Sequence, residues 1–577
     1  MRRLLHYLEG YRKEAILAPL FKMLEASFEL FVPLVVAGII DHGIMGIDIG
    51  YIWRMCAVMV ALGVIGLACS LTAQYFSAKA AMGFGTALRQ DLFRHINTLS
   101  YSELDKIGTA TLVTRITTDI NQTQSGVNLM LRLFLRSPFI VVGAVIMAFT
   151  ISVRIAIVFV VAVPLISLVI FLIMKATVPV YRDVQNELDH ISLITRENHT
   201  GVRVIRAFRR QKKEQEDFEK ANHVYTHTQV LAGRISALQN PMTCVIMNFA
   251  IIAILWLGAG QVDTGIITQG EVVALVNYMN QILLALLALA NLIVTVTKAM
   301  ASYARLNEVF DTKSTLTEPD TPAEGSSENP FRVEFRDVAF TYVGASAPSL
   351  SHISFTAAPG ETIGIIGGTG DGKTTLVNLI PRFYDVSDGC VLVDGQDVRA
   401  FSFADLRGRI GVVPQHAMLF KGTLRENMRW GKEDADDEEI RKALSIAQAL
   451  DFVEEKAEKL DTMVSQGGTN LSGGQRQRLT IARALVGRPE ILIMDDSASA
   501  LDFATDAALR SAIRTETKGM TVFIVSQRVA SIRHADRILV LDDGEMVGMG
   551  THEELFAGCE AYRELCLSQL SEQEVGR

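Results

Sequence analysis

Six long apolar segments in the first 300 residues constrain the fold of this chain more than any other feature. A helix that crosses a bilayer needs about 20 mostly apolar residues, and each segment is long enough. They lie at roughly residues 15–40, 52–79, 128–150, 154–175, 239–260 and 271–298. The sequence therefore predicts an α-helical membrane domain of six spans, with the lipid bilayer as a partner of the chain.

The distribution of charge separates this apolar part from the rest of the chain. The 577 residues carry a net charge of −8, but the first 310 hold 27 Lys and Arg against 21 Asp and Glu, and the remainder holds 28 against 42. A mildly basic apolar part followed by an acidic part is typical of a membrane domain fused to a soluble domain. The acidic total argues against a nucleic-acid-binding protein.

The basic residues also predict the topology. Most Lys and Arg of the first part lie in two long polar connections, at roughly residues 80–128 and 176–238, whereas the three short connections are mainly acidic. Positive charge close to membrane spans is retained on the cytoplasmic side. We therefore expect both long connections and both chain ends to be cytoplasmic. Residues 1–14 are basic and amphipathic, which predicts an interfacial helix ahead of the first span.

A second domain is predicted after a polar linker. Residues 311–330 are rich in Ser, Thr, Pro, Glu and Gly and show no period, which is typical of a linker. Strands and helices then alternate to about residue 560, and this order predicts an α/β domain with a largely parallel sheet. The expected organisation is a membrane domain at 1–310, a linker at 311–330 and a soluble domain at 331–577.

A glycine-rich motif in the second domain indicates a nucleotide site. An apolar strand at 362–366 leads into G-x-x-x-x-G-K-[ST], and residues 375–380 continue as a helix, which is the context the motif requires. Its backbone N–H groups and helix N-terminus bind phosphates. Lys373 can reach the β- and γ-phosphates and Thr374 can ligate Mg²⁺. The candidate ATP-binding residues here are Gly367, Gly368, Thr369, Gly370, Asp371, Gly372, Lys373, Thr374 and Thr375.

A second apolar strand supplies the carboxylate that such a site needs. Residues 491–494 (ILIM) end in Asp495, and an acidic residue at the end of a buried strand holds Mg²⁺ in P-loop NTPases. We therefore expect ATP and Mg²⁺ as the ligands of this domain. A chance glycine-rich turn is the alternative interpretation, and the flanking strand and helix argue against it.

Between these motifs lies the sequence Leu471-Ser472-Gly473-Gly474-Gln475. With LSGGQ in this place, nearly the whole chain resembles a half-transporter of the ATP-binding cassette (ABC) exporters of the multidrug and lipid class. The resemblance implies a six-span membrane domain followed by an α/β P-loop NTPase domain with a helical subdomain. In that family, ATP lies between the Walker motifs of one subunit and the signature of another. The signature residues implied to face a partner's ATP are Ser472, Gly473, Gly474 and Gln475.

The resemblance assigns further residues one at a time. Tyr342 matches the aromatic residue that stacks on adenine, and base–aromatic stacking tolerates any base. Gln415 matches the Q-loop glutamine that touches Mg²⁺. Asp502 closes Ser499-Ala500-Leu501-Asp502, which matches the D-loop. Short helices near residues 100–108 and 201–208 resemble the family's coupling helices.

Four positions depart from the family's pattern, one of which is Gln466, just before the signature, where the family often has Glu. Asp496 stands where the family has the Glu that acts as general base, and Gln527 replaces the switch His that contacts the γ-phosphate. Asp is one methylene shorter than Glu, about 1.5 Å less reach, and Gln cannot carry charge. Asp371 stands in the phosphate loop where the family has Ser or another small residue, and its carboxylate is mildly unfavourable beside phosphates.

Two interpretations of these departures remain open. One is harmless drift at an ordinary site. The other, which we favour, is an asymmetric pair in which this chain's own site binds ATP but hydrolyses it slowly. Its intact signature then completes a competent site on a different subunit that has Glu and His at the two positions. The chain would resemble the degenerate-site subunit of a bacterial heterodimeric multidrug exporter in the plasma membrane.

The predicted function is ATP-driven efflux of small hydrophobic or amphiphilic compounds. A homodimeric lipid flippase and an ATP-gated channel or regulator that transports nothing are the alternatives. Glu25 and Glu29 lie four residues apart in the first span, and carboxylates in the membrane face a cavity or a partner. They predict either an acidic wall of the substrate cavity, which would attract cationic amphiphiles, or a structural pair bonded to neighbouring helices.

Overall fold

The structure, a computed structural model, describes residues 6–319, 330–497 and 501–569. It forms two compact units. The first contains the residues up to Asn97 together with Ala110–Asp311, and the second contains Thr98–Thr109 together with the residues from Thr312 onward. The sequence placed residues 98–109 in the membrane domain, whereas their contacts join them to the second unit.

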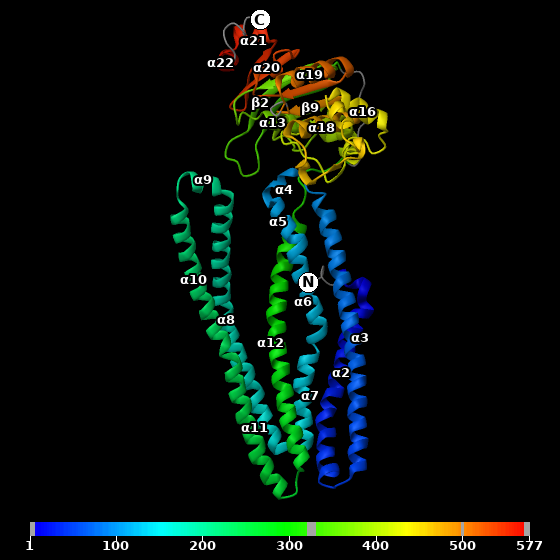
Figure 1. The fold of residues 1–577 in the computed structure, drawn as a ribbon, viewed down its shortest axis with the longest axis vertical. Helices are drawn as coiled ribbons and strands as arrows, with labels where there is room; N and C mark the ends of the chain where they lie inside the picture. The colour runs from blue at the N-terminus through cyan, green and yellow to red at the C-terminus, as the bar shows by residue number, and fades with distance from the viewer. Residues whose placement is uncertain (1–5, 320–329, 498–500, 570–577) are drawn as a thin grey trace. The chain divides into compact units, whose positions relative to one another are not determined.

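The first unit is a bundle of long helices (Figure 1). Within the described residues, six helical segments are long and apolar enough to cross a membrane, and each predicted span lies inside one of them, which confirms the six-span prediction. The elements are η1 (Glu9–Tyr11), α2 (Arg12–Gly38), η2 (Ile39–Ile44), α3 (Ile49–Ile96), α5 (Thr109–Thr114), η3 (Arg115–Asp119), α6 (Ile120–Leu133), α7 (Arg136–Ile151), α8 (Val153–Thr200), α9 (Val202–Ala207), α10 (Gln211–Ala237), α11 (Gln239–Asp263) and α12 (Gln269–Asp311).

Several of these helices are much longer than a membrane is thick. Helices α3 and α8 have 48 residues each, which is roughly 72 Å at the rise of an α-helix, against a hydrocarbon core of about 30 Å. The two long polar connections are therefore mostly helical continuations of the spans. In Figure 1, α8 and α10 lie side by side and the short helix α9 joins them.

The second unit is built on two main sheets. A six-stranded sheet has the order β12-β11-β3-β10-β9-β6 and is parallel except for β12 at one edge, and a four-stranded antiparallel sheet has the order β2-β1-β4-β5. The sequence predicted the parallel sheet and missed the antiparallel one. The strands are β1 (Val333–Phe340), β2 (Leu350–Ala357), β3 (Thr362–Ile366), β4 (Asp388–Val393), β5 (Gln396–Asp397), β6 (Ile410–Val413), β7 (Gly422–Thr423), β8 (Met463–Val464), β9 (Ile491–Asp495), β10 (Thr521–Val525), β11 (Arg537–Asp542) and β12 (Glu545–Gly550).

The helices of this unit include the predicted helix after the phosphate loop. They are α4 (Tyr101–Ile107), α13 (Lys373–Leu379), η4 (Val398–Ala400), α14 (Phe403–Gly408), α15 (Leu424–Arg429), α16 (Asp437–Ile446), α17 (Leu450–Glu454), η5 (Lys459–Asp461), η6 (Gln466–Gly468), α18 (Gly473–Val486), α19 (Phe503–Glu516), α20 (Val529–Ile532), α21 (His552–Gly558) and α22 (Glu560–Gln569). Helices α15 to α18 form the helical part next to the parallel sheet, as the implied helical subdomain requires.

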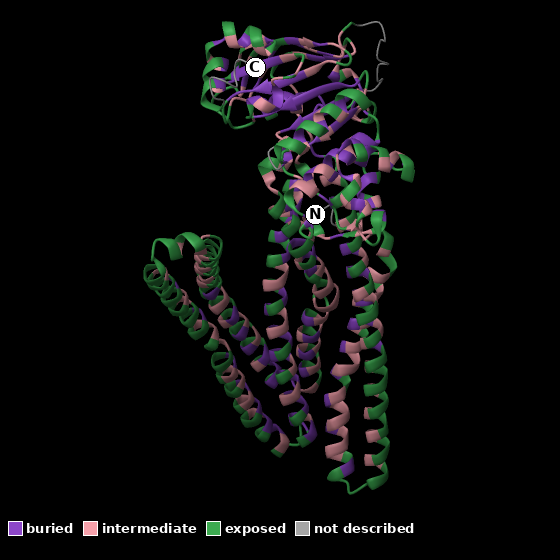
Figure 2. Ribbon diagram, turned by 45° about the horizontal axis from the view of Figure 1, so that its top comes forward, coloured by how far each residue is buried: buried purple, intermediate pink, exposed green. Residues whose placement is uncertain are grey.

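Two hydrophobic cores cover the two faces of the parallel sheet. In β9, Ile491 and Ile493 belong to the core that contains the antiparallel sheet and α13, while Leu492 and Met494 belong to the core that contains α16 and α18. Successive side chains of a strand point to opposite faces, so a central strand covered on both sides is continuously apolar. Figure 2 shows this burial in the strands of the second unit, whereas the spans of the first unit are largely exposed or intermediate.

Candidate active site

The predicted site residues of the second unit follow four neighbouring parallel strands. Gly367 comes directly after β3, Asp496 after β9, and Gln415 and Gln527 two residues after β6 and β10. Parallel strands place their carboxyl ends at one edge of the sheet, which is where open α/β sheets bind ligands. The order β3-β10-β9-β6 therefore brings these four loops together.

The phosphate loop has the backbone that its glycines predict. Gly370 and Gly372 adopt φ angles of 102° and 87°, in the region that favours glycine. Lys373 is buried, and its Nζ donates to the carbonyl oxygens of Gly367, at 3.0 Å, and Gly368. Burial lowers the pKa of Lys373, and the carboxylates around it act in the opposite direction. The loop thus holds one cation among its own backbone groups.

Asp371 lies against this loop rather than pointing away from it. Its Oδ2 accepts a hydrogen bond from the main-chain N–H of Gly368, and a Cβ added to Gly367 would lie 2.7 Å from the same oxygen. N–H groups of such loops are the donors that bind phosphate. The carboxylate of Asp371 is therefore an anion of the chain itself at the rim of the phosphate loop.

Thr374 and Asp495 form the candidate magnesium site. Thr374 Oγ1 donates to Asp495 Oδ1 at 3.0 Å, and burial raises the pKa of Asp495 while this hydrogen bond lowers it. Hydroxyl, carboxylate and amide oxygens are the ligands that Mg²⁺ prefers. The donor set of Thr374, Asp495 and Gln415 fits that ion. Asp496, directly after β9, accepts a hydrogen bond from the Gln415 side chain, which follows β6, the strand paired with β9.

Asp496 occupies a strained backbone position next to this set. Its φ of 44° lies in the left-handed region, where Asp is tolerated better than most residues. Its N–H donates to Val525 O at 3.0 Å, and its carboxylate accepts a hydrogen bond from the Gln415 side chain. Burial raises its pKa, and the Arg528 guanidinium opposes this shift. The turn after β9 thus points a partly desolvated carboxylate into the site.

Tyr342 lies beside the helix that follows the phosphate loop. Its hydroxyl is 3.0 Å from Thr375 Oγ1, and its ring packs edge-on against Phe340 and Tyr384. This places an aromatic ring next to α13. The stacking role of Tyr342 stays a prediction.

Gln527 shares a cavity with Asp496. Gln527 is exposed, and its main-chain oxygen accepts a hydrogen bond from Gln569 Nε2 at 2.7 Å. Sequence reasoning missed Gln569, because a glutamine 42 residues away near the chain end belongs to no motif.

The signature residues form the N-terminus of α18. Ser472 caps this helix through a reciprocal pair of hydrogen bonds with Gln475, and Ser472 and Gly473 are exposed. Asp502 caps α19 by accepting from the N–H and the hydroxyl of Thr505. Ser499 and Ala500 of the predicted D-loop lie outside the described residues.

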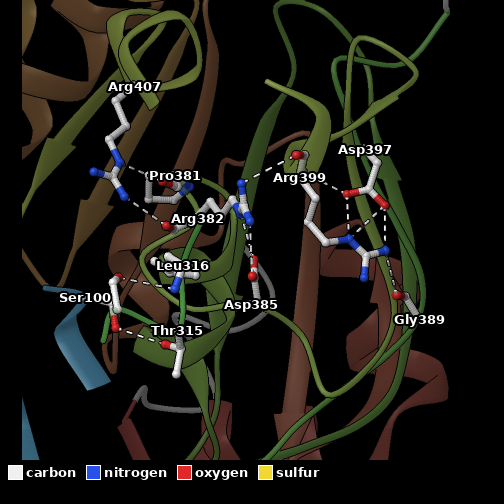
Figure 3. Close-up of polar contacts among 11 residues, drawn as sticks. Ser100, Thr315, Leu316, Pro381, Arg382, Asp385, Gly389, Asp397, Arg399 and Arg407 are labelled. Carbon is white, nitrogen blue, oxygen red and sulfur yellow. Dashed lines mark hydrogen bonds and ion pairs between the residues drawn. The ribbon is translucent and has the colours of Figure 1, made fainter. Parts of the chain in front are cut away.

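Helix α4 packs on the segment that follows α13. Tyr101 stacks at a tilt on Phe383 with 4.8 Å between ring centroids, and Tyr384 donates to Asp105 Oδ2 at 3.0 Å. Figure 3 shows Arg407 donating to the carbonyls of Pro381 and Arg382 in this segment, and Ser100 beside Thr315. Tyr384 therefore touches both α4 and Tyr342. In the sequence, the adjacent aromatic residues Phe383 and Tyr384 after the phosphate-loop helix were the signal from which this contact surface could have been predicted.

Glu25 and Glu29 have cationic partners in the first unit. Lys22 Nζ donates to Glu25 at 2.5 Å and to Ser70 Oγ at 3.0 Å, and Arg136 donates to Glu29 at 2.8 Å. The two carboxylates are thus balanced by two cations from α2 and α7. This arrangement favours the structural interpretation of the pair over an acidic wall, and a role in a substrate cavity stays a prediction.

Comparison with known proteins identifies the family. Residues 15–286 match the model for the ABC transporter transmembrane region, and residues 350–499 match the ABC transporter model. An uncharacterized ABC transporter ATP-binding protein of Mycobacterium tuberculosis is 37% identical over 573 residues, which cover 99% of this chain and 98% of that protein. The chain belongs to the ABC transporter family. The resemblance inferred from the signature and the P-loop is confirmed at this level.

Two further comparisons show what this ABC transporter is similar to. It is 33% identical over 530 residues to a protein of Hahella chejuensis named ATP-dependent lipid A-core flippase, covering 90% of this chain and 89% of the relative. The structure of a bacterial Atm1-family ABC exporter with ATP bound matches with a TM-score of 0.81 over 97% of this chain and 99% of that chain. Their identity is 23%, so this match shows the fold: six membrane helices followed by the nucleotide-binding domain.

Proposed function

We propose that this chain is one subunit of a heterodimeric exporter that uses ATP to move hydrophobic and amphiphilic compounds across a bacterial plasma membrane. Its own Walker site binds ATP and hydrolyses it slowly. The single observation that carries this proposal is Asp496, a short carboxylate fixed by a left-handed backbone and by Gln415. As a member of the exporter family, the chain couples ATP hydrolysis to transport.

The residues of the site divide the chemistry among them. The phosphate loop and Lys373 bind the β- and γ-phosphates, and Tyr342 stacks on adenine. Thr374, Asp495 and Gln415 would hold Mg²⁺, which neutralises charge on the phosphates when bound. Asp496 accepts the proton of the attacking water. A raised pKa makes it a better base, but about 1.5 Å of missing reach leaves it poorly placed for that water.

Exposed groups of the chain support a partner subunit. Ser472 and Gly473 present the positive end of the 14-residue helix α18, and such an end binds phosphate. In the first unit, Val204 and Phe208 at the tip between α8 and α10 are 61% and 73% exposed. Apolar side chains at the tip of a polar helical pair fit contact with another protein chain. We place this tip, both chain ends and the ATPase domain in the cytoplasm.

The turnover of the chain alone tests the slow site. We expect full-length chain in lipid nanodiscs to bind ATP, measured with a fluorescent analogue, and to hydrolyse it at no more than a few per cent of the rate of a competent exporter. Lys373→Ala, which removes the phosphate-binding ammonium, is the control for contaminating ATPase. Turnover at the rate of a competent exporter would contradict the proposal.

A homodimeric lipid flippase is the second candidate, because several similar proteins carry the name lipid A-core flippase. Such a flippase needs only this chain. Reconstituted alone with a fluorescent phospholipid and ATP, the chain would then move lipid between leaflets, and the rate would fall in Lys373→Ala. We expect no ATP-dependent movement without the second subunit.

A further inference from the structure

The last turn of the C-terminal helix α22 holds the loop that carries Gln527. The side-chain amide of Gln569 makes two hydrogen bonds to this loop: Nε2 donates to the main-chain oxygen of Gln527 at 2.7 Å, and Oε1 accepts from the main-chain N–H of Val529 at 2.9 Å. Both contacts are to the backbone. They therefore fix the path of the loop independently of its side chains.

The short helix α20 explains why this loop needs an outside partner. The first N–H groups of a helix have no acceptor within the helix. Arg528 is the N-cap residue of α20 and makes no side-chain cap hydrogen bond, since a guanidinium only donates. Val529 is buried, and a buried N–H without an acceptor is destabilising. Gln569 Oε1 supplies that acceptor, and its NH₂ group binds Gln527 at the same time.

Helix α22 is anchored independently of the loop. Tyr562 and Cys566 are fully buried in the core, and the Tyr562 hydroxyl is 2.7 Å from His552 Nδ1. Residues 562, 566 and 569 follow the spacing of one helix face. The face that packs on the core thus also presents Gln569 to the loop, so the loop is tied to a rigid element.

We propose that Gln569 is a positioning residue, which holds the segment Gln527–Val529 for ATP hydrolysis at this chain's own Walker site. Asp496, Gln527 and Gln569 line one cavity, and the N–H of Asp496 bonds to Val525, the last residue before the loop. Because Gln527 cannot carry charge, its contribution depends on its position, which the amide of Gln569 sets. This inference rests on the proposed slow hydrolysis at that site.

Variants of the last turn test this role in the full-length chain in lipid nanodiscs. Gln569→Ala removes both hydrogen bonds, and Gln569→Glu keeps the acceptor for Val529 but loses the donor to Gln527. Ser568→Ala is the matched control, because Ser568 Oγ donates to Leu565 O, within α22 itself, at 2.8 Å. A chain ending at Gln569 and a chain ending at Ser568 form a second matched pair.

We expect kcat for ATP to fall about tenfold in Gln569→Ala, in Gln569→Glu and in the chain ending at Ser568, because small displacements of aligned groups cost at least that much. The KM for ATP should stay within about twofold, since the phosphate loop is untouched. Ser568→Ala and the chain ending at Gln569 should keep the parent kcat. A rise in KM together with a fall in kcat would indicate general loss of structure at the site and would overturn the assignment.

Hydrogen–deuterium exchange of the Val529 amide gives a readout that needs no turnover. Exchange should be at least tenfold faster in Gln569→Ala and close to the parent rate in Gln569→Glu and Ser568→Ala. Equal exchange rates in Gln569→Ala and Ser568→Ala would refute the contact between Gln569 and Val529. Faster exchange in Gln569→Ala with an unchanged kcat would overturn the proposal, because Gln569 would then stabilise the loop without affecting hydrolysis. Turnover of the parent chain at the rate of a competent exporter would contradict the proposed slow site, and the exchange of the Val529 amide together with the kcat of the variants would still test the role of Gln569.

Discussion

Lengthening the carboxylate after β9 should restore hydrolysis at this chain's own site. Asp496→Glu adds one methylene, about 1.5 Å of reach, toward the water that a general base must contact. The side chain of Gln415, whose amide binds Asp496, has enough rotatable bonds to adjust to a longer carboxylate side chain. We therefore expect the ATPase rate of the chain alone to rise, with further gain from Gln527→His.

The substitution should change two separate quantities, the rate of ATP hydrolysis and the free energy of unfolding. A misplacement of about 1 Å costs on the order of 10²-fold in rate, and a general base contributes roughly 10²–10⁴, so a gain of about 10–100-fold is expected. Against this, Asp496 has a φ of 44°, and the left-handed conformation costs residues other than Gly, Asn and Asp roughly 1–2 kcal/mol. The free energy of unfolding should thus fall by about 1 kcal/mol.

The assay is steady-state ATP hydrolysis by the full-length chain in lipid nanodiscs, with Asp496→Asn as the control that keeps size and removes the base. The rate of the parent chain should fall as the pH is lowered through the pKa of Asp496, which burial raises, because only the ionised form accepts a proton. Asp496→Asn should lack this limb. An Asp496→Glu chain no faster than the parent would refute the geometric reasoning.

Three further predictions concern other contacts. Asp371→Ser removes the carboxylate that binds the Gly368 N–H, so the Kd for a fluorescent ATP analogue should fall about tenfold, or ~1.4 kcal/mol; an unchanged Kd would exclude repulsion by Asp371. Asp105→Ala removes the acceptor of the Tyr384 hydroxyl. If that hydrogen bond contributes about 1 kcal/mol, the amount of substrate moved per ATP hydrolysed by the assembled transporter should fall about fivefold. An unchanged ratio of substrate to ATP would exclude coupling through this contact. Glu25→Gln leaves the Lys22 ammonium buried without its carboxylate and should lower the free energy of unfolding by about 3–5 kcal/mol, measured as a lower thermal midpoint in detergent. The double variant with Lys22→Met should recover most of this stability. A double variant as unstable as Glu25→Gln would indicate a different role for the pair.

Much of the fold follows from local patterns in the sequence. The six spans are predicted by the length of apolar runs alone, and the phosphate loop by a strand, glycines and a helix in immediate succession. The meeting of Lys373, Thr374 and Asp495 follows once the strands are taken as parallel, because their carboxyl ends then share one edge. The four-stranded antiparallel sheet was missed because β1 also pairs with β4, and β2, β3 and α13 lie between these two strands in the chain, so this pairing depends on contacts distant in the sequence.

The contacts that sequence reasoning missed join residues far apart in the chain. Arg136 pairs with Glu29 across 107 residues, and Gln569 reaches Gln527 across 42. Each member is an ordinary polar residue in its local context, so no spacing or motif marks it. Asp371 was noticed as unusual, but its hydrogen bond to Gly368 depends on the positive φ of the loop glycines. Such pairs become visible only when the tertiary structure is known.

The asymmetric pair is tested most directly by comparing two variants of this chain in the assembled complex with its second subunit. Asp496→Asn impairs only this chain's own site. Gly473→Asp places a carboxylate at the exposed signature, where an added Cβ meets open space and the fold is preserved, and it impairs the site that uses the partner's Walker motifs. We predict that Asp496→Asn keeps most ATP hydrolysis and Gly473→Asp loses most of it. Equal loss in the two variants would contradict the account.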